Sequence, residues 1–341
     1  MSLESELYFS LPETKIFKLN EKCKAETDFF CTFVNLSIVF SRKSEIRCGR
    51  LPGRVSWYMR TYICQVMRKV LRFLFVIVLS VWAVDLSAQS QAVQFFAHRA
   101  SRFEYDENTL PAFKACYEQG IRGFETDIRM SKDGQLVVNH DETFARLTPC
   151  TGAVESMTSD EIRKLTTFQG NKILFLDELV GFLSDKDGLY VEFEMKVSPT
   201  SSYPEDRLRE YCDKLYKAVM SKKPEHSTYL FTSSSRDALN MMRKLHPDAD
   251  MLMIFSKPVC DETIQMAEAM GIKRIGCNMN GTTRSMVKKA KEAGLAVSLW
   301  PSRTPEDIML GVYLGAEYLC CDRAIEVKKF LDEKATFVKY K

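Results

Sequence analysis

Short apolar segments alternate with helical patterns from about residue 92 to the end of the chain, and this alternation constrains the fold more than any other feature. Thr158 and Glu161 form a capping box at one predicted helix start, and Gly120 ends another helix. Strands that alternate with helices over this length predict a parallel α/β fold. The nine predicted strands are VQFFA, GFETDIRM, LVVNH, LYVEFEMK, TYLFTSS, MLMIF, RIGCN, AVSLW and EYLCCD.

One of the nine segments cannot join a parallel sheet as the others do. GFETDIRM and LVVNH are separated only by SKDGQ, which is too short for the crossover between parallel strands. LVVNH is therefore predicted to fold back antiparallel, and eight strand-helix units remain. They predict a (β/α)8 TIM barrel with a β-hairpin extension after the second strand. A doubly wound open sheet is the alternative, but no glycine-rich phosphate loop supports it.

Residues 67–88 have the three parts of a secretory signal peptide. Arg68 and Lys69 precede an apolar run over residues 70–84, and small residues follow near Ala88. A membrane anchor is the alternative, although the apolar run is shorter than the roughly 20 residues that a span needs. The sequence predicts export to the periplasm or the cell exterior.

The segment before this predicted signal peptide, residues 1–66, has no sustained hydrophobic period and only isolated cysteines. We interpret it as an upstream extension from a misassigned start codon, or as disordered. The mature protein is then expected to begin near Gln89, with the barrel domain at 92–335.

The composition excludes some functions. A net charge of +3 among 341 residues, with no basic cluster interleaved with aromatics, gives no indication of nucleic-acid binding. The predicted mature part has cysteines at irregular spacings without a C-x-x-C, so neither a zinc nor a redox motif is indicated. Most of them are expected to be buried small side chains. They are Cys116, Cys150, Cys212, Cys260, Cys277, Cys320 and Cys321.

In a barrel of this kind the active site lies at the carboxyl ends of the strands. His98 and Arg99 end the first predicted strand, and Glu125 and Asp127 lie two apart on the second. Residues two apart in a strand share a face. The apolar residues that alternate with these carboxylates are predicted to face the helices, so the carboxylates face the barrel interior.

The next parallel strand carries Glu192, Glu194 and Lys196 on one face. The hairpin adds a histidine: a two-residue Asp-Gly loop would set Asp127 opposite His140, and a bulged loop would shift this pairing by one. The other two histidines of the predicted barrel lie in ordinary surface contexts and receive no role.

These side chains suit one kind of chemistry. Three carboxylates without cysteine ligands favour a hard divalent cation, Mg²⁺ or Ca²⁺. Two histidines can serve as general acid and general base, and Arg99 offers a planar fork to a phosphate oxygen. Together they supply what in-line displacement at a phosphodiester needs.

From about residue 93 to 331 the chain resembles the glycerophosphodiester phosphodiesterase family. That family's pattern runs H-R-G, E-N-T-x-x-A-F, E-x-D, a D-G turn, H-D and E-x-K. This sequence has HRA, ENTLPAF, ETD, KDG, HD and EMK in that order, and ARLTPCTG is similar to the family's R-x-T-x-G segment. It departs from the pattern at Ala100, in LWPSRTPED and in CDRA, which shape the expected pocket wall.

The resemblance implies a role for each matching residue. Metal ligands are Glu125, Asp127 and Glu194; the acid-base pair is His98 and His140; phosphate ligands are Arg99 and Lys196; and pocket-shaping residues are Glu107, Asn108, Glu192 and Trp300. Glu192 is also a second candidate metal ligand. The order in which the two histidines act stays open.

The resemblance further implies metal-dependent hydrolysis of small glycerophosphodiesters to glycerol 3-phosphate and an alcohol. Membrane contact is expected only through an uncleaved N-terminal segment. Two other functions stay open: a phosphatidylinositol-phospholipase-C-like barrel, in which the substrate's own hydroxyl attacks, and a barrel that binds phosphodiesters or glycans without turnover.

Overall fold

The computed structural model describes residue 70 and residues 92–341. The predicted extension at 1–66 and nearly all of the predicted signal peptide at 67–88 lie outside the described residues. Among the residues that the structure describes, no helix is both long enough and apolar enough to cross a membrane.

Eight parallel strands close into a barrel, as the sequence predicted. Strand β1 pairs with β2 on one side and with β9 on the other, which closes the sheet. All nine predicted strands are present, eight in the barrel and one in the hairpin. The barrel strands are β1 (Gln94–Ala97), β2 (Gly123–Met130), β4 (Tyr190–Met195), β5 (Thr228–Ser233), β6 (Met251–Ile254), β7 (Arg274–Asn278), β8 (Ala296–Ser302) and β9 (Tyr318–Cys321).

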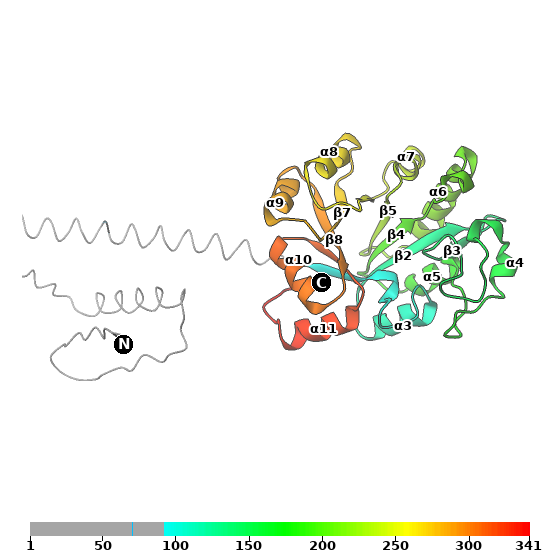
Figure 1. Cartoon of the computed structure of the whole chain (residues 1–341), viewed down its shortest axis with the longest axis horizontal. Helices are drawn as coiled ribbons and strands as arrows, with labels where there is room; N and C mark the ends of the chain where they lie inside the picture. The colour runs from blue at the N-terminus through cyan, green and yellow to red at the C-terminus, as the bar shows by residue number, and fades with distance from the viewer. Residues whose placement is uncertain (1–69, 71–91) are drawn as a thin grey trace, which may run out of the picture. The chain divides into compact units, whose positions relative to one another are not determined.

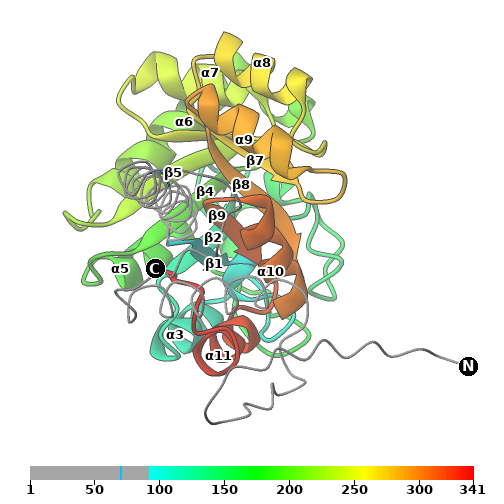
Figure 2. The same cartoon turned by 90° about the vertical axis from the view of Figure 1, so that its left-hand side faces the viewer.

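Helices follow the barrel strands in turn and surround them (Figures 1 and 2). The predicted capping box joins Thr158 and Glu161 at a short helix, and Gly120 has the left-handed backbone (φ +88°) expected beyond a helix end. The helices are α3 (Leu110–Glu118), α4 (Ser159–Ile162), α5 (Leu176–Leu183), α6 (Glu205–Met220), α7 (Arg236–Leu245), α8 (Asp261–Ala269), α9 (Arg284–Glu292), α10 (Pro305–Leu314) and α11 (Ala324–Glu333).

The hairpin has the register predicted for a bulged loop, shifted by one residue from that of a two-residue loop. Strand β3 (Leu136–Val138) runs antiparallel to β2, and Ile128 lies opposite Val138. A three-residue turn closes the hairpin, with Gly134 at φ +82°. Asp127 therefore lies opposite Asn139, one residue before His140, and its carbonyl accepts the Asn139 N–H at 3.0 Å.

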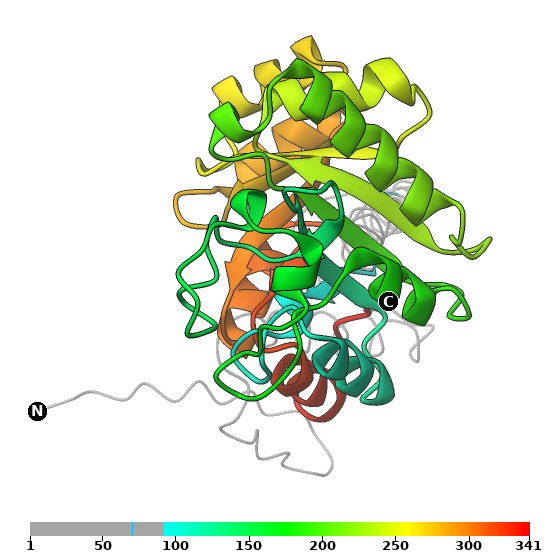
Figure 3. The same ribbon diagram turned by 90° about the vertical axis from the view of Figure 1, so that its right-hand side faces the viewer.

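Between β3 and α5 the chain makes an excursion over residues 139–175. It contains α4 and a 3₁₀ turn at Val154–Ser156, and its loops, drawn in green, face the viewer in Figure 3. The excursion and Val137 of β3 form a small apolar core. That core consists of Val137, Phe144, Val154, Ile162, Ile173 and Phe175.

Two apolar regions support the barrel. Outward-facing side chains pack against the helices. The ring centroids of Phe124 on β2 and Phe113 on α3, for example, are 5.6 Å apart. Inside the barrel Phe96, Tyr190 and Leu230 form a second cluster. They share strand faces with His98 and Glu194, so this cluster forms the floor beneath the polar rim. The seven cysteines of residues 92–341 are all free, and five of them are buried.

Candidate active site

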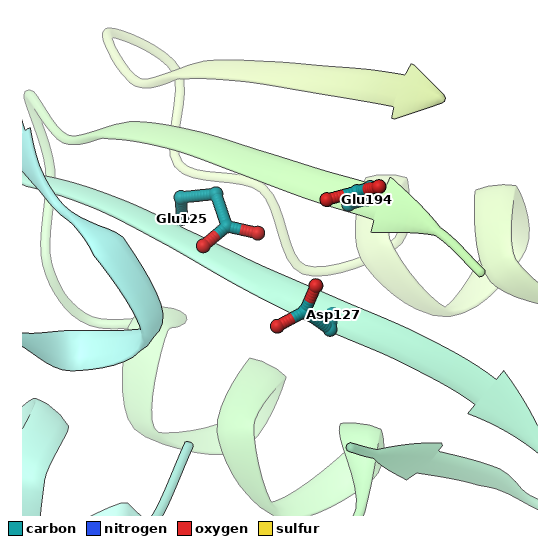
Figure 4. A group of neighbouring side chains, drawn as sticks. All are labelled: Glu125, Asp127 and Glu194. Atoms are coloured by element: carbon teal, nitrogen blue, oxygen red, sulfur yellow. The ribbon is translucent and has the colours of Figure 1, made fainter. Parts of the chain in front are cut away.

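Three carboxylates meet at the carboxyl ends of two neighbouring strands. Asp127 on β2 lies beside Glu194 on β4 in the strand register, and Glu125 lies one pleat below Asp127. One oxygen from each of the three lies within 4.8 Å of the others. Figure 4 shows the carboxyl groups directed into a common space.

Two oxygens of this triad have no hydrogen-bond donor. Glu125 Oε1 and Asp127 Oδ1 are both buried without a hydrogen bond, although Asp127 Oδ1 forms an ion pair with Lys196 Nζ at 3.4 Å. A buried carboxylate oxygen without a donor is costly unless a cation satisfies it. The residues therefore fit a hard divalent ion, because each can supply one oxygen to a common centre.

The charges of the triad act on one another. Burial and the neighbouring charges of Asp127 and Glu194 raise the pKa of Glu125 well above its usual value. Burial also acts to raise the pKa of Asp127, but the charges of Lys196 and Arg99 outweigh it and hold that pKa far below its usual range. In the metal-free protein one carboxylate thus stays ionised while its neighbour tends to bind a proton.

Two basic side chains contact the triad. Lys196 Nζ lies 2.8 Å from Glu194 Oε1 and 3.4 Å from Asp127 Oδ1. Arg99 Nε lies 3.3 Å from Asp127 Oδ2, and its Nη1 donates to Glu107 Oε1 at 3.2 Å. Arg99 is thus a bridge between the triad and Glu107, in addition to its predicted contact with phosphate.

A left-handed turn after β1 directs Arg99 into the site. Arg99, Ala100 and Ser101 have φ values of 50°, 58° and 68°, which side-chain-bearing residues adopt only at a cost. The turn brings the Arg99 N–H to Glu125 Oε2 at 3.0 Å. Asn108, also left-handed, donates from Nδ2 to Asp127 Oδ2 at 2.9 Å.

His98 lies between the triad and the last strand. Its Nδ1 is 2.5 Å from Asp322 Oδ1, and its Nε2 is 3.7 Å from Glu125 Oε2. Arg102 donates from Nε to the same Asp322 oxygen at 2.9 Å. Because Asp322 is fully buried, its orientation of the imidazole is well defined.

His140 approaches from the excursion. Its Nδ1 is 2.7 Å from Asp141 Oδ1, and the backbone carbonyl of His140 accepts hydrogen bonds from Arg129. Burial lowers the pKa of His140 more than the charge of Asp127 raises it, so the neutral imidazole is favoured near pH 7.

Comparison with known proteins decides the family. The sequence profile of the glycerophosphoryl diester phosphodiesterase family matches residues 98–326. The chain belongs to the glycerophosphoryl diester phosphodiesterase family. A glycerophosphodiester phosphodiesterase of Caldanaerobacter subterraneus is 30% identical over 233 residues, covering 66% of this chain and 92% of the relative. The enzyme class implied by the sequence resemblance, a phosphoric diester hydrolase, is confirmed.

Solved structures share the fold. A phosphodiesterase of Oleispira antarctica, in complex with the product sn-glycerol-3-phosphate, superimposes with a TM-score of 0.64 and is 21% identical over 71% of this chain and 98% of its own. A glycerophosphodiester phosphodiesterase of Parabacteroides distasonis gives a TM-score of 0.60 at 20% identity, over 72% of this chain and 99% of its own.

Two residues that the family resemblance singled out lie deeper in the barrel. Glu192 accepts a hydrogen bond from the Tyr190 hydroxyl, and burial raises its pKa to about 7 despite that bond. It lies beside Glu125 in the register but outside the carboxylate triad. Trp300 packs against the interior cluster, and its indole Nε1 is buried without a hydrogen-bond partner.

The structure of this family member adds residues that the sequence did not single out. Asp322 and Arg102 flank His98, and Arg146 contacts both Asp141 and Glu107. Asp322 belongs to the CDRA segment, which departs from the family pattern, and Arg146 belongs to ARLTPCTG, which is similar to it; these two segments were the available signals. His226 and His246 contact surface acids instead of the triad.

Proposed function

We propose that the protein hydrolyses glycerophosphodiesters to glycerol 3-phosphate and an alcohol, using a divalent ion and the two histidines. The observation that carries this proposal is the convergence of three carboxylates, two of them with unsatisfied buried oxygens, beside two carboxylate-bound imidazoles. A site that only binds phosphodiesters has no need of two oriented imidazoles.

Glu125, Asp127 and Glu194 are the proposed ligands of Mg²⁺ or Ca²⁺. An ion bound there would supply positive charge to the phosphodiester oxygens and make a water molecule easier to deprotonate. Lys196 and Arg99, which already contact these ligands, add fixed positive charge at the same place. This charge is positioned for the negative charge that develops as phosphorus is attacked.

His98 and His140 are the proposed proton-transfer pair. Each imidazole has its Nδ1 at a carboxylate, so Nε2 is the nitrogen left for the substrate or the attacking water. One histidine removes a proton from the nucleophile, and the other donates one to the departing alcohol. The carboxylates Asp322 and Asp141 fix the tautomers, and they stabilise each imidazolium as it forms.

The substrate class follows from the family and from the Oleispira antarctica protein, whose structure holds sn-glycerol-3-phosphate. A panel of glycerophosphodiesters with choline, ethanolamine, glycerol and inositol head groups tests it, after chelation and with Mg²⁺ or Ca²⁺ returned separately. We expect glycerol 3-phosphate to appear only with a divalent ion. A cyclic phosphate product would indicate attack by the substrate's own hydroxyl, and binding without turnover would indicate a non-catalytic barrel.

We also propose that the protein is exported, with residues 67–88 as its signal peptide and a mature chain that begins near Gln89. The support is the order of basic, apolar and small residues in the sequence. Mass spectrometry of the protein from its native host tests this. Peptides from residues 5–50 in the active protein would contradict it, and a retained apolar run would favour a membrane anchor.

A further inference from the structure

Arg146 lies on the excursion and connects two parts of the candidate active site. Its Nη1 and Nη2 donate to the two oxygens of Glu107 at 2.8 and 2.6 Å. Its Nε donates to Asp141 Oδ2 at 2.6 Å. A guanidinium is suited to this arrangement, because its planar fork serves one carboxylate in bidentate fashion and keeps a donor for another.

On one side this bridge leads to a proposed catalytic histidine. The Asp141 oxygen that Arg146 does not contact lies 2.7 Å from His140 Nδ1. Among the described residues, the Asp141 carboxylate has only His140 and Arg146 as side-chain partners. Its side chain is 32% exposed, so without Arg146 the carboxylate is free to rotate into solvent and leave the imidazole unoriented.

On the other side the bridge leads to the triad. Glu107 is buried, and burial acts to raise its pKa, but bonds from Arg146 and Arg99 outweigh this and keep it ionised. Arg99 in turn contacts Asp127. Without Arg146, the full charge of Glu107 falls on Arg99 and draws that guanidinium away from Asp127. One side chain thus sets the position of groups at both ends of the site.

We propose that Arg146 is a positioning residue that holds His140 through Asp141 and Arg99 through Glu107, without contacting the substrate. This inference rests on the proposed function, because it assigns Arg146 an effect on the same reaction. His98 has a comparable pair in Arg102 and Asp322. Asp322, however, is fully buried, whereas Asp141 depends on Arg146 for its orientation.

The test compares steady-state kinetics of Arg146→Ala, Arg146→Lys, His140→Ala and the double variant on the glycerophosphodiester that the wild type turns over fastest. Arg163→Ala is the matched control. Arg163 lies on the same excursion with a side-chain exposure of 47% against 45% for Arg146. It lies 3.9 Å from Glu178 and stacks on Phe175, and it contacts none of the proposed site residues within the described part of the chain.

We expect Arg146→Ala to lower kcat by about 10²-fold, the cost of a small displacement of reacting groups, while KM changes by less than about threefold. Lysine at this position should recover little, because one ammonium cannot bridge two carboxylates. Guanidinium ion added to Arg146→Ala should restore part of kcat, since the side chain is half exposed, and it should not restore His140→Ala. In the His140→Ala background, Arg146→Ala should cost clearly less than it costs in the wild type, because only the effect that runs through Glu107 and Arg99 remains.

Several results would overturn the inference while leaving the proposed function intact. One is a wild-type kcat in folded Arg146→Ala or Arg146→Lys. Another is a double variant in which the loss of kcat from Arg146→Ala adds in full to the loss from His140→Ala. The third is a loss of kcat in Arg163→Ala as large as that in Arg146→Ala. Thermal unfolding identifies a variant that fails to fold, and the lysine variant then decides. If the wild type hydrolyses no member of the panel, the proposed function itself fails.

Discussion

Replacing Asp127 with asparagine tests the proposed metal site most directly. The change keeps the size of the side chain and its acceptor for Asn108, but it removes one of three charges that converge within 4.8 Å. The change also removes the repulsion between Asp127 and Glu125, and this removal stabilises the metal-free protein. At the same time it removes the attraction between Asp127 and Lys196, and this removal destabilises the metal-free protein. The informative quantity is therefore the stabilisation that the ion adds, and not the absolute stability.

The size of that stabilisation follows from linkage. At a metal concentration of about 100 times Kd, binding to the native state adds about 2.7 kcal/mol to the free energy of unfolding. Mutation of residues that only hydrogen-bond to metal ligands typically lowers metal affinity by about 10–100-fold. We therefore expect the loss of a ligand's charge to lower metal affinity by at least about 100-fold. The variant then gains only about 0.4 kcal/mol at the same concentration.

The assay is thermal unfolding in chelator and in Mg²⁺ or Ca²⁺. For a domain of about 250 residues, 1 kcal/mol corresponds to about 2–4 °C in Tm. The metal-induced rise in Tm should therefore fall from about 5–10 °C in the wild type to about 1–2 °C in Asp127→Asn. Asp187→Asn is the control, because Asp187 is a half-exposed acid that pairs with His226 before the amino end of β4, and its loss should leave the metal-induced rise unchanged. An equal rise in Asp127→Asn and wild type would refute the assignment of the site.

Substitutions at four further residues test other parts of the structure. His98→Ala and His140→Ala should each lower turnover about 10²-fold while unfolding curves stay close to wild type; a near-native rate would remove that histidine from the proton-transfer pair. Arg129→Met should destabilise by about 3–5 kcal/mol in denaturant titrations, because Glu155 loses its buried cation while Arg129's bonds to the Ser198 and His140 carbonyls are lost; partial recovery in Arg129→Met/Glu155→Gln is the check. Hydrogen bonds from Ser131 and Ser159 lower the pKa of Asp133 to about 2, so its stabilising effect is present above pH 3.8 and is lost as the pH falls towards 2. Asp133→Asn should thus be less stable than wild type at neutral pH, and the gap should close between about pH 4 and pH 2; a constant gap would contradict this.

The fold was predictable because its signals are local. Each barrel strand is a short apolar run, and each turn or helix boundary has its own chemistry, such as the box at Thr158 and Glu161. The hairpin register could be narrowed only to two choices. A two-residue Asp-Gly loop and a three-residue loop ending in Gly134 are both compatible with SKDGQ, because glycine serves the left-handed position in either.

The candidate site was predictable where its residues end strands. Alternation placed Glu192 and Glu194 on one face but could not rank them as ligands. The structure distinguishes their positions: Glu194 lies beside Asp127 within the triad, whereas Glu192 lies outside it and accepts a hydrogen bond from the Tyr190 hydroxyl. The ARLTPCTG motif pointed to the segment of Arg146, but the contacts of Arg146 could not be predicted, because they depend on how a long excursion folds back over the rim.

The ionic balance of the rim supports the proposed divalent ion independently of the geometry of the three carboxylates. The side chains that contact one another around the triad include six carboxylates and four permanent cations, an excess of two negative charges while the histidines are neutral. Without an ion, the raised pKa of Glu125 favours binding of a proton there, which would neutralise one of the two excess negative charges. The proposed divalent ion would balance all of it at the place where two buried oxygens accept no hydrogen bond, so we expect the rim to be neutral when that ion is bound. The carboxylates are Glu107, Glu125, Asp127, Asp141, Glu194 and Asp322, and the cations are Arg99, Arg102, Arg146 and Lys196.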